Sequence, residues 1–155
     1  MQTMTRPLFN TAWMRFQEIN IKTEKVGAKI GGNVGLNVAS GAFTHVPAVR
    51  LSFVLNRSGV RIPRIANQTI SGADGSWYFT RVRDLRNYLQ RRLGPADVHS
   101  LPARASNLQR RRGLLLFDLP GWTDNGGHAT LWNGVHAADA SDFSQTRDML
   151  LWALP

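Results

Sequence analysis

Apolar residues recur at helical spacing in three parts of the chain. From Pro7 to Ile19 they fall on one face, and proline suits the first turn of a helix. The segment Pro47–Arg57 repeats apolar residues in the same way, and Gly59 supplies an end. A third run extends from Val82 to Leu93, where Gly94 and a proline stop it. These patterns predict three helices, of which the second is buried.

Shorter segments with the composition of strands lie at 75–82, 113–117 and 127–132. The last of these is followed by Asn133-Gly134, the favoured dipeptide of a two-residue hairpin turn, so we expect a return strand from Val135 towards Asp139. The glycine-rich stretch 27–41 predicts a loop. Together the segments predict one α+β domain over residues 1–155, with a central helix packed on an antiparallel sheet.

The amino-acid composition excludes some kinds of site and favours some kinds of partner. The chain has no cysteine, which excludes disulfides, thiolate zinc sites and thiol catalysis in this sequence. The net charge of +9 favours an acidic partner, and both nucleic acid and bacterial wall polymer carry suitable anionic groups. No apolar run has the length of a membrane span, and the first residues lack the apolar core of a secretory signal. We therefore expect a soluble protein made in the cytoplasm, without membrane insertion.

The predicted hairpin brings two polar side chains together. If Asn133-Gly134 is the whole loop, Trp132 faces Val135, and counting outward pairs His128 with Asp139 across the two strands. The carboxylate would then orient the imidazole, as the acid does in a nucleophile–base–orienter triad. A different register would make Asp142 the next candidate for the acid. The alternative is a solvated His–Asp pair on the surface of the hairpin.

A helix N-terminus lowers the pKa of a thiol placed there, and the buried helix begins at Pro47. Residues 48–52 read Ala-Val-Arg-Leu-Ser, residues 56–60 Asn-Arg-Ser-Gly-Val, and residues 127–134 Gly-His-Ala-Thr-Leu-Trp-Asn-Gly. With these motifs, and with the segments 7–13 and 78–89, the chain closely resembles the family-four type VI secretion amidase effectors. The resemblance spans most of the sequence.

The resemblance implies a papain-like fold of the NlpC type and a peptidoglycan amidase that kills rival Gram-negative cells. Such enzymes cut the γ-D-glutamyl to meso-diaminopimelate bond of the stem peptide with a Cys-His-Asp triad. Their cysteine immediately precedes the Ala-x-Arg-(Met or Leu)-Ser helix. Carried over to this sequence, the base is His128, the acid is Asp139, and Pro47 occupies the position of the nucleophile.

Proline supplies no nucleophile, so this chain is expected to be inactive as an amidase. His45 and Val46 also depart from the asparagine-containing approach expected before the cysteine. His45 could act as a substitute nucleophile or metal ligand, but two further ligands at a suitable spacing are not evident, so we predict no metal and no cofactor. The candidate substrate contacts are Arg50, Ser52, Gly127 and Trp132.

The resemblance further implies three partners: the peptidoglycan stem peptide, the type VI secretion machinery and a cognate periplasmic immunity protein. It also implies delivery into the periplasm of target cells. Two other functions compete with the amidase, namely a non-catalytic peptidoglycan binder of the same fold and a basic nucleic-acid-binding module. The latter rests on charge alone, without the aromatic platform typical of nucleic-acid readers, so we expect no nucleic-acid partner.

Overall fold

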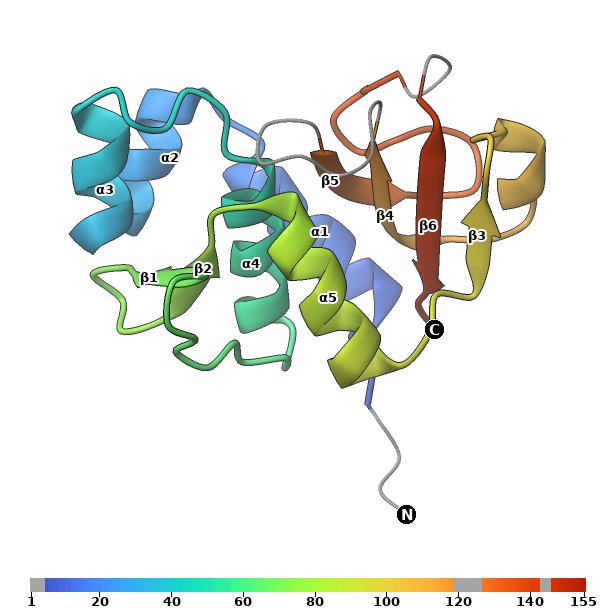
Figure 1. The fold of residues 1–155 in the computed structure, drawn as a ribbon, viewed down its shortest axis with the longest axis horizontal. Helices are drawn as coiled ribbons and strands as arrows, with labels where there is room; N and C mark the ends of the chain where they lie inside the picture. The colour runs from blue at the N-terminus through green and yellow to red at the C-terminus, as the bar shows by residue number, and fades with distance from the viewer. Residues whose placement is uncertain (1–4, 119–126, 143–145) are drawn as a thin grey trace.

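The computed structural model describes residues 5–118, 127–142 and 146–155. Helices gather on one side of the molecule and a four-stranded sheet on the other (Figure 1). The helices are α1 (Phe9–Ile19), α2 (Thr23–Ile30), α3 (Gly32–Ala39), α4 (Pro47–Arg57) and α5 (Val82–Leu93), with a 3₁₀ turn, η1, at Ala105–Leu108. The strands are β1 (Thr69–Ser71), β2 (Trp77–Phe79), β3 (Val98–Ser100), β4 (Gly113–Asp118), β5 (Gly127–Trp132) and β6 (Asp148–Ala153). The predicted α+β class is confirmed.

Helix α4 is the central helix that the sequence predicted. It spans Pro47–Arg57, begins with its proline at the first helical position, and ends before Gly59, whose φ is 94°. Its apolar side chains contact α1 and α5 on the helical side, and β2 and β5 on the strand side. Burial on several sides fixes the direction of α4 and therefore the place where its N-terminus emerges.

The glycine-rich stretch 27–41 was predicted to be a loop, and this prediction is wrong. In the structure it forms most of the helix pair α2 and α3. Gly31 and Gly32 have positive φ and make the turn between the two helices. A Cβ on Gly35 would lie 2.9 Å from the backbone oxygen of Gly27, and one on Gly27 only 2.7 Å from Cβ of Val38. The glycines thus allow two helices to approach closely, which offsets their low helix propensity.

The main sheet has the strand order β3-β6-β4-β5, and all its pairings are antiparallel. Leu114, Leu116 and Leu131 face the helices, while Leu115 and Phe117 belong to a second apolar cluster on the opposite face. Strands β4 and β5 match the predicted segments. The C-terminal strand β6, which pairs with β4 along its whole length, was not predicted.

Two further expectations need adjustment. The predicted strand at 75–82 is only the short β2, which pairs with β1 and is followed by the expected helix α5. The predicted return strand from Val135 does not form; a single bridge between Trp132 and Ala137 takes its place. In the described part of the chain, no helix is long and apolar enough to cross a bilayer.

Ser52 joins the central helix to the small sheet. Its hydroxyl donates to the Ala48 carbonyl oxygen at 2.7 Å and accepts from the Phe79 amide at 2.9 Å, and the side chain is fully buried. The hydroxyl is thus engaged within the protein and has no exposed surface, which argues against the assignment of Ser52 as a substrate contact. Ser52 is a structural link between α4 and β2.

We therefore predict that Ser52→Ala destabilises the fold by about 1 to 3 kcal/mol, because the Phe79 amide would remain buried without an acceptor. Chemical denaturation measures this loss. The exposed Ser106→Ala is the control and should change the free energy of unfolding by less than about 0.5 kcal/mol. Equal stability of the two variants would contradict the assignment.

Candidate functional site

The site begins at the N-terminus of α4. Pro47 is half-buried at the first helical position, and the N-cap residue, Val46, makes no side-chain capping hydrogen bond. Arg50 donates its amide to the Val46 carbonyl oxygen at 2.9 Å, so the helix is regular from its first turn. Proline is tolerated here because its missing amide hydrogen would have had no partner inside the helix. The N-terminal partial positive charge of α4 is therefore preserved at Pro47.

His128 and Asp139 lie within hydrogen-bond reach, as the sequence predicted. Nε2 of His128 is 2.6 Å from Oδ2 of Asp139. The carboxylate beside His128 is thus that of Asp139, and its role as the acid stays a prediction. The His128 ring also packs against Phe117, its neighbour across β4 and β5, with the ring centres 5.2 Å apart.

The hairpin that makes this pair differs from the predicted one. Trp132 pairs with Ala137, so four residues form the turn, and counting outward places Thr130 opposite Asp139. The side chain of Asn133 stabilises the wider turn by accepting from the amides of Val135 and His136, each at 2.8 Å. The register has moved by two residues, which keeps Asp139 on the face of His128.

Asp139 accepts hydrogen bonds from other residues besides His128. Its Oδ1 accepts from the Thr130 hydroxyl at 3.0 Å and from the hydroxyl and amide of Ser141 at 2.6 and 3.1 Å. Burial alone would raise the pKa of Asp139, but the hydrogen bonds from His128 and Ser141 and the charge of His128 hold it well below its usual range. Thr130 and Ser141 were missed, although Thr130 shares the strand face of His128 and Ser141 follows the acid at the spacing of an Asx turn.

Arg50 ties the first turn of α4 to the C-terminal end of α1. Its guanidinium donates to the carbonyl oxygens of Ile19 and Ile21, at 3.3 and 2.7 Å. Burial lowers the pKa of Arg50, while the nearby charge of Asp139 acts in the opposite direction. This charge effect indicates that Asp139 lies near Arg50, which belongs to the first turn of α4. A substrate contact by Arg50 stays a prediction.

The other candidates differ in their surroundings. Trp132 shares the strand face of His128, but it is buried in the second apolar cluster, which argues against its assignment as a wall of the substrate site. Gly127 begins β5 next to the histidine, and a Cβ there would lie 2.8 Å from Cβ of Val82. The site can therefore accept only glycine here without moving α5. A role of Gly127 in substrate binding stays a prediction.

His45 is exposed just before α4. Among residues 5–118, 127–142 and 146–155, no three histidine or acidic side chains are grouped so that they could hold a metal ion. His136, in the hairpin turn, packs edge-on against Trp13 with the ring centres 6.3 Å apart. Among these histidines, His128 is the one paired with Asp139, and the arrangement supplies a proton acceptor with a fixed orientation.

The depressed pKa of Asp139 predicts a pH-dependent contribution to stability. Its folded-state pKa lies below the unfolded value of about 3.9, so the folded chain binds fewer protons at this site. The stabilisation should be complete above the unfolded pKa and should be lost as the pH falls through and below about 4. Chemical denaturation of the parent chain and of Asp139→Asn measures this contribution. The difference between their free energies of unfolding should shrink as the pH is lowered.

The exposed Glu24→Gln serves as the control and should show no such convergence. A difference between the parent and Asp139→Asn that stays constant from about pH 7 to about pH 3 would contradict the proposed charge state of Asp139.

Comparisons with known proteins indicate the family of the chain. The model of the family described as type VI secretion system (T6SS), amidase effector protein 4, matches residues 43–152. No curated protein sequence matches the chain. The effector Tae4 from Salmonella typhimurium, solved with the immunity protein Tai4 from Enterobacter cloacae, is 34% identical, with a TM-score of 0.89 over 97% of this chain and 100% of the other.

Two structures from Enterobacter cloacae are similar to the same degree. The Tae4–Tai4 effector–immunity complex matches at 33% identity and a TM-score of 0.91, over 97% of this chain and 100% of the effector. The type VI effector Tae4 solved alone is 33% identical, with a TM-score of 0.91 over 99% of this chain and 100% of the effector. The family match covers more than half of the chain and agrees with the fold, and the chain therefore belongs to the T6SS amidase effector protein 4 family.

Proposed function

We propose that this chain is a type VI effector domain, over residues 1–155, that recognises the peptidoglycan stem peptide at a site lacking only its nucleophile. The observation that carries the proposal is the combination of a fully bonded His128–Asp139 pair with a proline at the start of α4. With proline at position 47, the chain binds the γ-D-glutamyl to meso-diaminopimelate segment without cleaving it. It is thus a non-catalytic member of an amidase family.

The loss of hydrolysis follows from the chemistry of proline. Pro47 offers neither a thiol nor a hydroxyl, and its ring carries only C–H groups towards a substrate. No cysteine elsewhere in the sequence could take over. The base meanwhile keeps its orientation: a proton on Nε2 of His128 is donated to Asp139, which leaves the lone pair of Nδ1 to accept a proton.

A cysteine at position 47 would complete an amide-hydrolysing site. Nδ1 of His128 would take the thiol proton, and the sulfur would attack the amide carbonyl carbon. The carbon–nitrogen bond would then break as the amine accepts the proton from His128, leaving a thioester. Water, deprotonated by the same histidine, would hydrolyse the thioester and regenerate the thiol. Asp139 stabilises the positively charged histidine in both halves of this cycle.

The partners follow from the family. Solved relatives are effector–immunity complexes of Tae4 with Tai4, and we infer that this chain also has a cognate immunity protein that acts in the periplasm. Delivery by the type VI secretion machinery to the periplasm of a target cell would bring the domain to its wall substrate. The basic surface suits this substrate, since stem peptides carry free carboxylates.

The proposal is tested by repairing the nucleophile. Pro47→Cys is expected to release stem-peptide fragments from purified sacculi at a rate at least about 100-fold above background, whereas the parent chain should stay at background. The thiol would be activated by the α4 N-terminus and by His128. Chromatographic analysis of the released muropeptides identifies the bond that is cut.

Two controls make the result specific. Thr44→Cys places a thiol at an exposed position three residues earlier and should stay inactive. Adding His128→Ala to Pro47→Cys should lower the rate by about 100-fold or more. Cleavage by the parent chain, or a rate unaffected by His128→Ala, would refute the proposed roles of these residues.

A further inference from the structure

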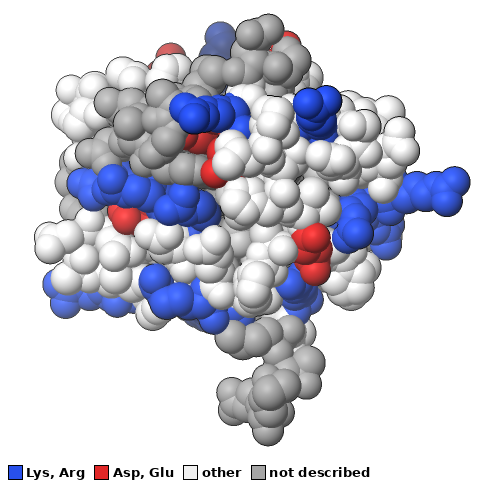
Figure 2. Space-filling model, turned by 45° about the vertical axis from the view of Figure 1, so that its right-hand side comes forward, with Lys and Arg blue, Asp and Glu red and all other residues white. Residues whose placement is uncertain are grey.

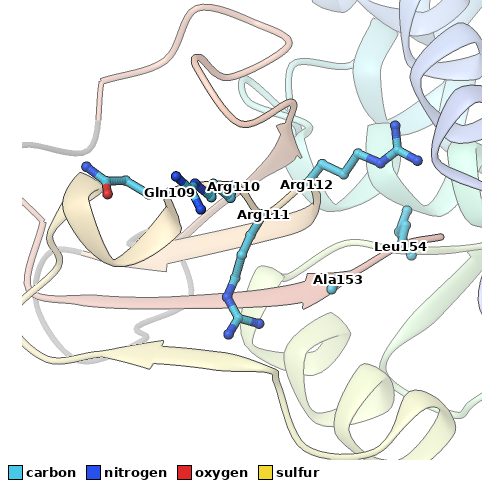
Figure 3. Close-up of a pocket in the computed structure, with 6 residues that line it drawn as sticks. All are labelled: Gln109, Arg110, Arg111, Arg112, Ala153 and Leu154. Carbon is cyan, nitrogen blue, oxygen red and sulfur yellow. The ribbon is translucent and has the colours of Figure 1, made fainter.

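A run of three arginines precedes β4 at the end of the sheet remote from His128. Arg110, Arg111 and Arg112 are exposed, and together with Gln109, Ala153 and Leu154 they line a pocket of about 480 Å³ (Figure 3). The backbone holds this edge in place, because Leu154 donates its amide to the Arg112 carbonyl oxygen at 3.0 Å. The pocket is therefore built on paired strand ends.

The three guanidinium groups point in different directions. Arg110 has a φ of 62°, which turns the chain before the strand begins. In Figure 3, the side chains of Arg111 and Arg112 extend to two sides of the end of β6, where Ala153 and Leu154 lie. Arg112 is held over the ring of Phe9, with its Cζ 4.9 Å from the ring centre. Such a spread cannot converge on one small anion, but it suits an anionic chain with spaced charges.

Within the described part of the chain, the charges of these arginines are offset only in part, by the effect of Asp97 on Arg111. None of the three forms an ion pair there with a carboxylate. The nearby Asp97 is bonded to Arg6 and accepts the Ala153 amide at 2.8 Å. Burial opposes the effect, but these bonds and the charges of Arg6 and Arg111 lower the pKa of Asp97. The rim of the pocket therefore keeps a net positive charge.

The register of the sheet separates this pocket from the catalytic pair. Gly113, next to Arg112, pairs with Trp132, whereas His128 pairs with Phe117. Four residue steps along the strand separate the two pairs, or about 13 Å at the rise of a β-strand. On the face shown in Figure 2, basic side chains form several separate groups and outnumber the acidic ones, which suits contact with an extended anionic surface.

We propose that the arginine-lined pocket is a second wall-binding site, which holds the carboxylates of a stem peptide other than the one presented to His128. The identity of the polymer rests on the proposed function. The planar guanidinium groups match carboxylates in charge and geometry, and a wall polymer repeats carboxylates at intervals that separate arginines can reach. The site would hold the domain on the sacculus while the first site samples neighbouring stem peptides.

The test measures binding of the parent chain and two charge-matched variants to purified sacculi. One combines Arg110→Ser, Arg111→Ser and Arg112→Ser, and the other combines Lys22→Ser, Lys25→Ser and Lys29→Ser, three exposed lysines of the α2 region. The arginine variant should lose about 10-fold or more in affinity, and the lysine variant less than about 3-fold. Arg111→Glu alone, which leaves the Arg112–Phe9 contact intact, should lose at least about 5-fold.

Sacculi whose carboxylates have been converted to amides should bind the parent as weakly as the arginine variant binds untreated sacculi. Equal losses in the two triple variants would overturn the proposal, because bulk charge would then explain the binding. A loss of affinity for duplex DNA without a loss for sacculi would also overturn it and assign the pocket to nucleic acid.

A further measurement separates this inference from the proposed function. In the Pro47→Cys background, cleavage of a soluble fragment with a single stem peptide should be unchanged by the arginine substitutions. If Pro47→Cys restores no cleavage, the proposed catalytic roles fail, whereas the sacculus measurements still decide the second site. Slower cleavage of the soluble fragment by the arginine variant would contradict a site separate from the catalytic pair.

Discussion

The packing of α4 is the constraint on which the rest of the structure depends. Its apolar side chains contact α1 and α5 on one side and β2 and β5 on the other, so the helix cannot rotate or slide without opening the core. Ser52 adds a buried hydrogen bond to β2, and Arg50 ties the first turns to the carbonyl oxygens of Ile19 and Ile21. These contacts fix where the N-terminus of α4 emerges.

His128 and Asp139 form a hydrogen-bonded unit that does not include position 47. Asp139 receives hydrogen bonds from Thr130 and Ser141 as well as its contact with His128, and all four residues belong to β5 or the loop that follows. Loss of a nucleophile from α4 would remove none of these bonds. Proline in turn leaves the helix regular, because the first amide of a helix has no internal partner. The scaffold of an amidase can thus persist when its nucleophile is absent.

Local patterns were sufficient to predict the elements that carry the site. The periodicity of 47–57 predicted α4 correctly, and the composition of 127–132 predicted β5. The turn at Asn133 was predicted with the wrong length, because its side chain caps two amides and favours a four-residue turn. The pair of His128 and Asp139 was nevertheless correct, since a shift of two residues preserves the strand face.

Other features depended on contacts distant in sequence. Helices α2 and α3 were taken for a loop because their glycines are explained only by the close approach of the two helices. Strand β6 was missed, and its position in the sheet is set by pairing with β3 and β4. Ser52 and Trp132 were expected to contact substrate, but their burial follows from packing against β2 and within the second apolar cluster. The spacing of residues within one segment cannot predict such contacts.

The central claim is that position 47 lies where a helix terminus and His128 together activate a thiol. The most direct measurement is the pH dependence of alkylation of Pro47→Cys without substrate, because this would be the only cysteine in the chain. The account predicts a thiol pKa at least about one unit below the ordinary value of about 8.5, returning most of the way in the added His128→Ala background. A thiol that titrates at the ordinary value in both backgrounds would show that position 47 lies outside the reach of His128, and would contradict the account.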